Sequence, residues 1–160
     1  MFTVTAKDHD VIITGMDAIS RRNMPSDIVI FTKPGTYHTT PEESADYSSL
    51  EMDLQPAEWQ EIYRGVIPAQ FDKLVALDDF TASVTIAAGQ TQSFYAYVSN
   101  GLLFTAPTAA DSSTEGGTTG DAVAVEDEGI IIYEGQVMRG LFQKVVGLGR
   151  WGGVIRYRLA

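Results

Sequence analysis

Hydrophobic and polar residues alternate along most of this chain, and this period of two is typical of β-strands with one buried face. Helical spacing, with apolar residues at i, i+3 and i+4, is not sustained anywhere. The pattern predicts about nine or ten strands, which are enough for two sheets. They are Phe2–Ala6, Val11–Met16, Asp27–Lys33, Trp59–Ile67, Ser83–Ala87, Gln92–Ser99, Gly101–Thr105, Gly129–Glu134 and Gly153–Leu159, with Leu141–Val146 as a further candidate.

Turn-forming residues separate these segments. Pro34 and Gly35 fit a type II turn, because proline fixes φ near −65° and glycine accepts a positive φ. Gly89 marks another reversal, and the pair Asn100-Gly101 predicts a hairpin that joins the strands on either side of it. No strand is followed by a helix of crossover length. The predicted fold is therefore an all-β, antiparallel, two-sheet β-sandwich that is jelly-roll-like.

The length of 160 residues suits one domain, and we expect a single β-sandwich domain over 1–160. Two segments break the alternation, and we interpret them as long loops near 38–58 and 106–128. The first is rich in Ser, Thr and acidic residues. The second is acidic without any basic residue, and it is rich in Gly, Ser and Thr.

Composition excludes several classes of function. The chain has 11 Lys and Arg against 21 Asp and Glu, a net charge of −10, so we expect no nucleic-acid partner. Its apolar runs are far shorter than the roughly 18 to 20 residues that span a bilayer. The absence of cysteine excludes disulfides, thiolate nucleophiles and Cys-based zinc sites. The N-terminal residues lack the pattern of a secretory signal, which favours a cytosolic protein or a module of a longer secreted precursor.

Several segments resemble a known module. In order, DIVIFTKPGTY, EWQEIYRGVI, VTIAAGQTQSFYAYVS, IIIYEG and RWGGVIRYRL are similar to a β-sandwich module found in predicted secreted and surface proteins of diatoms, other algae and some bacteria. The resemblance spans nearly the whole chain, although Gly152 stands where that module typically has Asn. It implies an extracellular or cell-surface location within a longer precursor. It implies no catalytic residue and no particular ligand.

Aromatic side chains are the natural candidates for a binding site, because a flat ring stacks on a sugar face while polar neighbours contact the hydroxyls. Tyr95 and Tyr97 share one face of their strand, while Phe94, Ala96 and Val98 alternate with them on the expected core face. The two tyrosines could form an exposed platform. The alternative is that they cover the sheet as cross-strand pairs.

The last predicted strand supplies further ligand-binding candidates. Trp151 precedes it, and Arg156 and Arg158 alternate onto its outer face. The arginines either contact an anionic ligand or form a solvated strand face. We expect Trp59 and Trp151 to be at least half buried, with Trp151 as a plug at one end of the sandwich. The expected core residues of this strand are Ile155, Tyr157 and Leu159.

Acidic residues provide the candidate metal ligands. Glu126, Asp127 and Glu128 offer clustered carboxylates, as calcium requires, and calcium is the candidate cofactor. The alternative is that their charge keeps a loop soluble. His9 lies between two aspartates in DHD, where either a metal role or a solvated turn is conceivable, although strand-like alternation would point it away from both.

We expect that the protein is not an enzyme. No Gly-x-Ser-x-Gly motif occurs and neither histidine has a motif partner, so no catalytic residue is assigned. The favoured function is a non-enzymatic extracellular recognition or adhesion module, with a glycan or a surface protein as partner. The alternatives are a structural spacer that self-associates in a wall or surface protein, and a glycan-active hydrolase. Oligomers are compatible with each.

Overall fold

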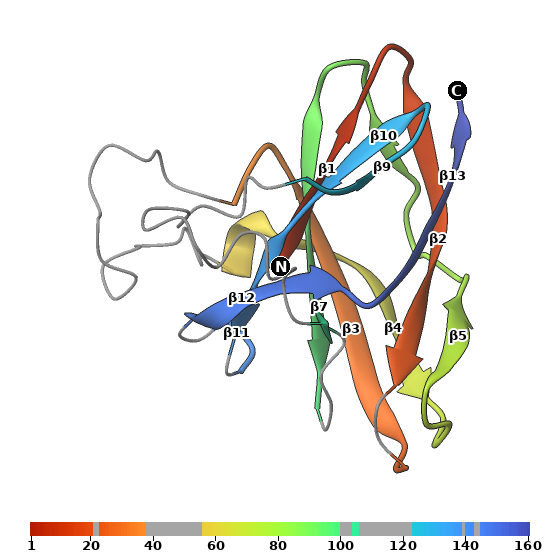
Figure 1. Ribbon diagram of the computed structural model, residues 1–160, viewed down its shortest axis with the longest axis vertical. Coiled ribbons are helices and arrows are strands. Elements are labelled where there is room, and N and C mark those ends of the chain that lie inside the picture. Colours follow the sequence, from red (N-terminus) through yellow and green to blue (C-terminus); the bar gives the residue numbers. More distant parts are fainter. Residues whose placement is uncertain (21–22, 38–55, 100–103, 106–122, 139, 143–144) are drawn as a thin grey trace.

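The computed structural model describes residues 1–20, 23–37, 56–99, 104–105, 123–138, 140–142 and 145–160 (Figure 1). A short 3₁₀ turn, η2 (Pro56–Glu58), precedes the fourth strand. In the described part of the chain, no helix combines the length and apolarity needed to cross a membrane. The strands are β1 (Phe2–Ala6), β2 (Val11–Ser20), β3 (Ser26–Pro34), β4 (Gln60–Ile67), β5 (Lys73–Leu77), β6 (Val84–Ile86), β7 (Thr91–Val98), β8 (Phe104–Thr105), β9 (Val123–Glu126), β10 (Ile130–Tyr133), β11 (Gly135–Met138), β12 (Val145–Trp151) and β13 (Gly153–Leu159).

The strands form antiparallel sheets that pack against one another. A six-stranded sheet has the order β4-β3-β7-β1-β10-β9, and a second sheet has β13-β2-β5 with β6 beside β2. A three-stranded sheet, β11-β12-β8, crosses the outer side of the six-stranded sheet (Figure 1). The amide of Gln136 on β11 donates to the carbonyl oxygen of Met1, the residue just before β1, at 2.8 Å. The predicted all-β antiparallel sandwich is confirmed.

Alternation along β7 sets the two faces of the six-stranded sheet. Phe94 and Ala96 are buried toward the second sheet, and Val98 packs against the same core. Tyr95 and Tyr97 point to the opposite face, as the period of two predicts. The six-stranded sheet therefore has apolar side chains on both faces.

A bulge adjusts the central strand of the second sheet. The ladder between β13 and β2 shifts register between Arg156 and Tyr157, so that Thr14 is an extra residue on β2. Ile13 and Met16 are both buried although they are three positions apart. Without the extra residue, strict alternation would place one of them in solvent.

The main core lies between the six-stranded sheet and the β13-β2-β5 sheet. Phe2 is the fully buried centre of an aromatic group in this core, with its ring centroid 5.5 Å from Phe94 and 5.2 Å from Trp151. Trp151 is buried, as expected, and belongs to this core. The buried members of the main core are Phe2, Val4, Ala6, Val11, Ile13, Met16, Ala18, Ile28, Ile30, Ile62, Ile67, Leu77, Val84, Ile86, Phe94, Ala96, Ile130, Trp151 and Ile155.

Local turn chemistry was predicted better than pairing. Gly35 and Gly89 have φ of 76° and 71°, which confirms the two glycine turns. The predicted hairpin around Asn100-Gly101 is wrong, because β7 pairs with β1 and β3 while β8 pairs with β12. The eight residues of β7 find longer partners elsewhere in the chain than the two residues of β8 could offer. Residues 100–103 themselves lie outside the described residues.

Several strands depart from the predicted boundaries. β5, β9 and β11 were not predicted, and β9 forms within the segment 106–128 that we interpreted as a loop. The candidate strand 141–146 is displaced, because residues 141–142 form a turn and β12 begins at Val145. β5 and β9 bury few side chains, so the apolar alternation that locates a strand is weak in them. β11 is short and begins with Gly135 and Gln136, which give no apolar alternation. The remainder of both predicted loops, 38–55 and 106–122, falls outside the described residues.

Candidate functional site

A second hydrophobic cluster lies on the outer side of the six-stranded sheet. Its buried members are Met1, Tyr37, Trp59 and Tyr95. The antiparallel register of β3 and β7 places Phe31 opposite Tyr95, and Val29 opposite Tyr97, on this side. Besides the buried Tyr37, five rings gather here, and we call these five the aromatic face; they are Phe31, Trp59, Tyr95, Tyr97 and Phe142.

The rings of the aromatic face pack mainly edge to face. Phe142 lies across the others, with its centroid 5.0 Å from Tyr95, 5.3 Å from Phe31 and 6.2 Å from Trp59. Trp59 meets Tyr95 at 6.0 Å with an interplanar angle of 69°. Such tilted contacts are the favoured geometry for aromatic pairs. The centre of the aromatic face is thus a packed cluster with its edge open to solvent.

The hydroxyl of Tyr95 holds the turn that carries Phe142. It donates to the Gly140 carbonyl oxygen at 2.9 Å and accepts from the Phe142 amide at 3.1 Å. Phe142 has a φ of 50°, which is unusual for a bulky residue. Burial raises the pKa of Tyr95 to about 12, so the hydroxyl keeps its proton for the bond to Gly140.

This geometry corrects the expectation of an exposed Tyr95–Tyr97 platform. Tyr95 is only 3% exposed beneath Trp59 and Phe142, so it covers the sheet. Tyr97 is half-buried and lies at the rim. Trp59 is buried, as expected, but its place beside Tyr95 could not be read from the sequence. Phe31 and Phe142 were missed, because neither ring has a local motif.

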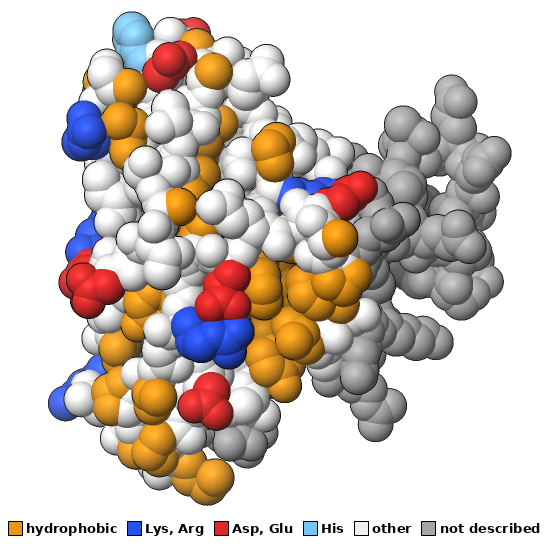
Figure 2. Space-filling view, turned by 180° about the vertical axis from the view of Figure 1, so that it is seen from behind, with side chains coloured by type: hydrophobic (Ala, Val, Ile, Leu, Met, Phe, Trp, Pro, Cys, Tyr) orange, Lys and Arg blue, Asp and Glu red, His pale blue; other side chains and the backbone are white. Residues whose placement is uncertain are grey.

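Charged side chains border the aromatic face. The buried ammonium of Lys33 lies 5.5 Å from the centroid of the Trp59 ring and 3.3 Å from a carboxylate oxygen of Glu58. On β4, Arg64 donates to Glu61 through Nε at 2.9 Å, and this hydrogen bond lowers the pKa of the Glu61 carboxyl. Figure 2 shows hydrophobic side chains in contiguous groups on one side of the molecule, interrupted by separate basic and acidic side chains.

The other predicted ligand-binding residues do not join Tyr95 and Tyr97. Trp151 lies in the main core, on the opposite side of the six-stranded sheet. Arg156 contacts both Asp17, at 3.0 Å, and Asp78, and it donates to the Met16 carbonyl oxygen at 3.3 Å. These intramolecular partners occupy Arg156.

Arg158 is exposed on the outer face of the β13-β2-β5 sheet, beside the partly exposed Ile12 of β2. The alternation of β13 was read correctly for the arginines and for the buried Ile155. Leu159 was expected in the core but is 53% exposed, because it ends an edge strand. The predicted set is therefore split among three sheets: Tyr95 and Tyr97 lie on β7, Trp151 on β12, and the two arginines on β13.

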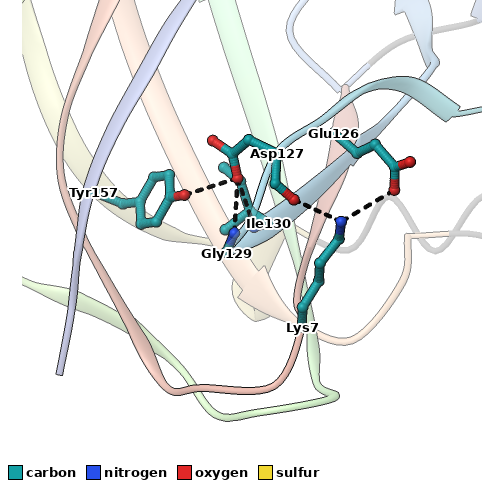
Figure 3. A network of polar contacts seen from close by, with 6 residues as sticks. All are labelled: Lys7, Glu126, Asp127, Gly129, Ile130 and Tyr157. Carbon is teal, nitrogen blue, oxygen red and sulfur yellow. Dashed lines mark hydrogen bonds and ion pairs between the residues drawn. The ribbon is translucent and has the colours of Figure 1, made fainter.

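The acidic candidates form a structural turn (Figure 3). Asp127 accepts hydrogen bonds from the amides of Gly129 and Ile130, at 2.9 and 3.0 Å, and from the Tyr157 hydroxyl at 2.7 Å. Burial by itself would raise the pKa of Asp127, but these hydrogen bonds outweigh it and hold the pKa below its usual value. Lys7 pairs with Glu126 at 3.2 Å.

Among the described residues, no three His, Cys, Asp or Glu side chains lie in an arrangement that could hold a metal ion. In this part of the chain, the structure therefore shows no group of three ligands that would support the calcium hypothesis for Glu126, Asp127 and Glu128. His9 is exposed, and the neighbouring Asp10 accepts from the Ala88 amide at 2.8 Å.

Comparison with known proteins gives no relative: no protein-family model, no curated protein and no solved structure matches this chain. What the aromatic face can bind therefore follows from its own side chains. These combine partly exposed rings with charged groups on the same side of the sheet. This combination suits a ligand that has both apolar faces and hydroxyl groups.

Proposed function

We propose that this protein is a non-enzymatic recognition module that binds a glycan at the rim of its aromatic face. The observation that supports the proposal is the half-buried Tyr97, whose ring continues a buried aromatic cluster onto the surface. An extracellular or cell-surface location within a longer protein belongs to the same proposal. It rests on the sequence resemblance to the β-sandwich module of secreted and surface proteins described above.

Tyr97 is suited to stack on a sugar ring because the protein already holds it in place. Val29 lies beside it on β3, and Arg64 lies beyond Val29 on the same face of β4. A ring fixed by its neighbours loses little conformational freedom on binding. The Arg64–Glu61 pair supplies hydrogen-bond donors and acceptors at roughly two strand spacings, about 10 Å, from Tyr97.

A structural, self-associating module is the second candidate function. It is favoured by exposed hydrophobic side chains at the end of the sandwich where β3 begins and β4 ends. Figure 2 shows hydrophobic side chains gathered at the lower end of the molecule, which is this same end in Figure 1. Apolar surface of this kind commonly marks a protein contact. The exposed residues are Met24, Val66, Phe71 and Leu74.

Glycan binding is tested by screening the protein against immobilised oligosaccharides and titrating any that bind. Tyr97→Ala should weaken binding about fivefold, since a stacked aromatic contact contributes on the order of 1 kcal/mol. Tyr97→Phe keeps the ring and should bind nearly as well. Tyr133→Ala removes another partly exposed tyrosine of the same sheet and is the matched control. Unchanged binding by Tyr97→Ala, or no binding to any oligosaccharide, would contradict the proposal.

A further inference from the structure

Two edge strands lie on the same side of the sandwich. Within the described residues, β13 is hydrogen-bonded to β2 alone, and β9 is hydrogen-bonded to β10 alone. The turn between β9 and β10 contacts β13 directly, because Asp127 accepts from the Tyr157 hydroxyl (Figure 3). One edge strand of each sheet, β9 in the first and β13 in the second, therefore lies on this side of the molecule.

Both edge strands expose hydrophobic side chains. On β9, Val123 and Val125 are 49% and 56% exposed, and on β13, Val154 and Leu159 are 43% and 53% exposed. An edge strand also presents a row of unpaired backbone N–H and C=O groups. Such a strand pairs readily with another chain unless charge or shape opposes the pairing.

Charge selects the partner of each edge. β13 carries Arg156 and Arg158, whereas β9 ends at Glu126 and continues into Asp127 and Glu128. Pairing β13 with β13, or β9 with β9, would bring like charges together, and like charges on neighbouring strands are destabilising. Pairing β13 with β9 brings opposite charges together.

Arg158 and Glu128 are the side chains best placed to respond to such a partner. Both are exposed, and the structure shows no ion pair for either among the described residues. Arg156 and Glu126, by contrast, already contact Asp78 and Lys7.

We propose that a second copy of this chain docks along this side, with the β9 edge of each copy pairing with the β13 edge of the other. A twofold axis parallel to the strands makes both pairs at once, so the assembly closes as a dimer. Each six-stranded sheet then continues into the second sheet of the partner copy. This surface is separate from the aromatic face.

The direction of the strands is compatible with this arrangement. β9 runs parallel to β1, because both pair antiparallel to β10. The chain reverses direction between β1 and β2 (Figure 1), and β13 pairs antiparallel to β2, so β13 and β9 run the same way. The new pairs are therefore parallel, and they are somewhat less stable per residue than antiparallel ones.

The absence of cysteine from the chain makes cross-linking a direct test. Val125→Cys and Leu159→Cys each place one thiol on an edge strand. Mixing the two variants under mild oxidation should give a mixed disulfide dimer, while either variant alone should give little. A dimer formed by Val125→Cys alone would show β9–β9 pairing and overturn the proposal, as would the lack of any cross-link.

Sedimentation of the unmodified chain over a range of concentrations provides an independent measurement. We expect a monomer–dimer equilibrium whose dissociation constant rises at least tenfold in Arg158→Glu and returns toward its original value in Arg158→Glu combined with Glu128→Arg. Arg64→Glu makes the same change of charge on the other sheet and should leave the equilibrium unchanged. A monomer at every concentration, or no rescue by the double variant, would overturn the proposal. Tyr97→Ala should dimerise normally, so failure of glycan binding and failure of dimerisation are distinguishable.

Discussion

At the scale of single residues, hydroxyl and carboxylate groups fix turns that hydrophobic packing alone would leave loose. Tyr95 holds residues 140–142 with one hydroxyl that is both donor and acceptor. Asp127 gathers three donors at the turn before β10. In each case a side chain satisfies backbone groups of a turn: Tyr95 reaches its turn from a distant strand, and Asp127 belongs to its own turn.

Tyr95→Phe removes the hydroxyl while keeping the ring. The Phe142 amide and the Gly140 carbonyl lose their partner, so we expect a loss of about 1–2 kcal/mol in the free energy of unfolding. Urea denaturation measures this loss. Tyr97→Phe removes a half-buried hydroxyl from the next position on the same face and should change stability by less than about 0.5 kcal/mol. Equal effects of the two substitutions would contradict this role for Tyr95.

Asp127 makes stability depend on pH with a definite sign. Its pKa in the folded protein is lower than the ordinary value of 3.8, so folding favours the ionised carboxylate. Its contribution to stability is present above that ordinary pKa and is lost as the pH falls through the lower, folded pKa. The difference in unfolding free energy between the wild type and Asp127→Ala should therefore be constant near pH 6 and shrink below about pH 4. A difference that grows on acidification would contradict this assignment.

At the scale of elements, a glycine lets two strands approach closely where β12 leads into β13. A Cβ atom on Gly153 would overlap the backbone carbonyl oxygen of Asp17 and would lie 2.9 Å from Nε1 of Trp151. The pairing of β13 with β2 at this position depends on the missing side chain.

Gly153→Ala should consequently destabilise the fold by about 1–3 kcal/mol, because backbone atoms must move to admit the methyl group. Thermal unfolding followed by circular dichroism measures the effect. Thr85→Ala, an exposed change on β6 of the same sheet, should stay within about 0.5 kcal/mol of the wild type. If Gly153→Ala were equally neutral, the close approach of β13 to β2 would not require glycine at position 153.

The alternation of the sequence predicted where strands lie better than it predicted which strands pair with each other. β1 and β13 have the predicted boundaries, and β3 and β7 differ from theirs by one residue at each end. The neighbours of β7 could not be predicted, because a turn signal such as Asn100-Gly101 reports only local geometry. Pairing is decided by competition among distant strands, and no short stretch of sequence records the outcome.

At the scale of the whole molecule, the six-stranded sheet separates two hydrophobic clusters. Trp151 belongs to the main core, and Trp59 belongs to the cluster on the outer side. The sequence showed that Tyr95 and Tyr97 share a face, which is a property of one strand. It could not show that Trp59 and Phe142, from distant segments, would cover Tyr95. The site is thus a product of tertiary packing.

The two tryptophans, which are the only ones in the chain, allow the clusters to be followed separately. Trp59→Phe leaves Trp151 as the sole tryptophan, and Trp151→Phe leaves Trp59. Because both clusters share β3 and β7, we expect fluorescence and circular dichroism to report one coincident urea transition in each variant. A transition of Trp59 that precedes loss of the sheet would show instead that the outer cluster opens independently.

The position of β1 inside the six-stranded sheet has a consequence for synthesis on the ribosome. Its two neighbours are β7, which begins at Thr91, and β10, which begins at Ile130. β1 precedes both of these strands in the chain, so it must remain unpaired in this sheet until at least β7 has been synthesised. Folding that depends on such distant contacts is slow, and it leaves apolar segments exposed in the nascent chain. Phe2 and Val4, which end as fully buried residues, are thus side chains for which a chaperone and the nascent sheet would compete.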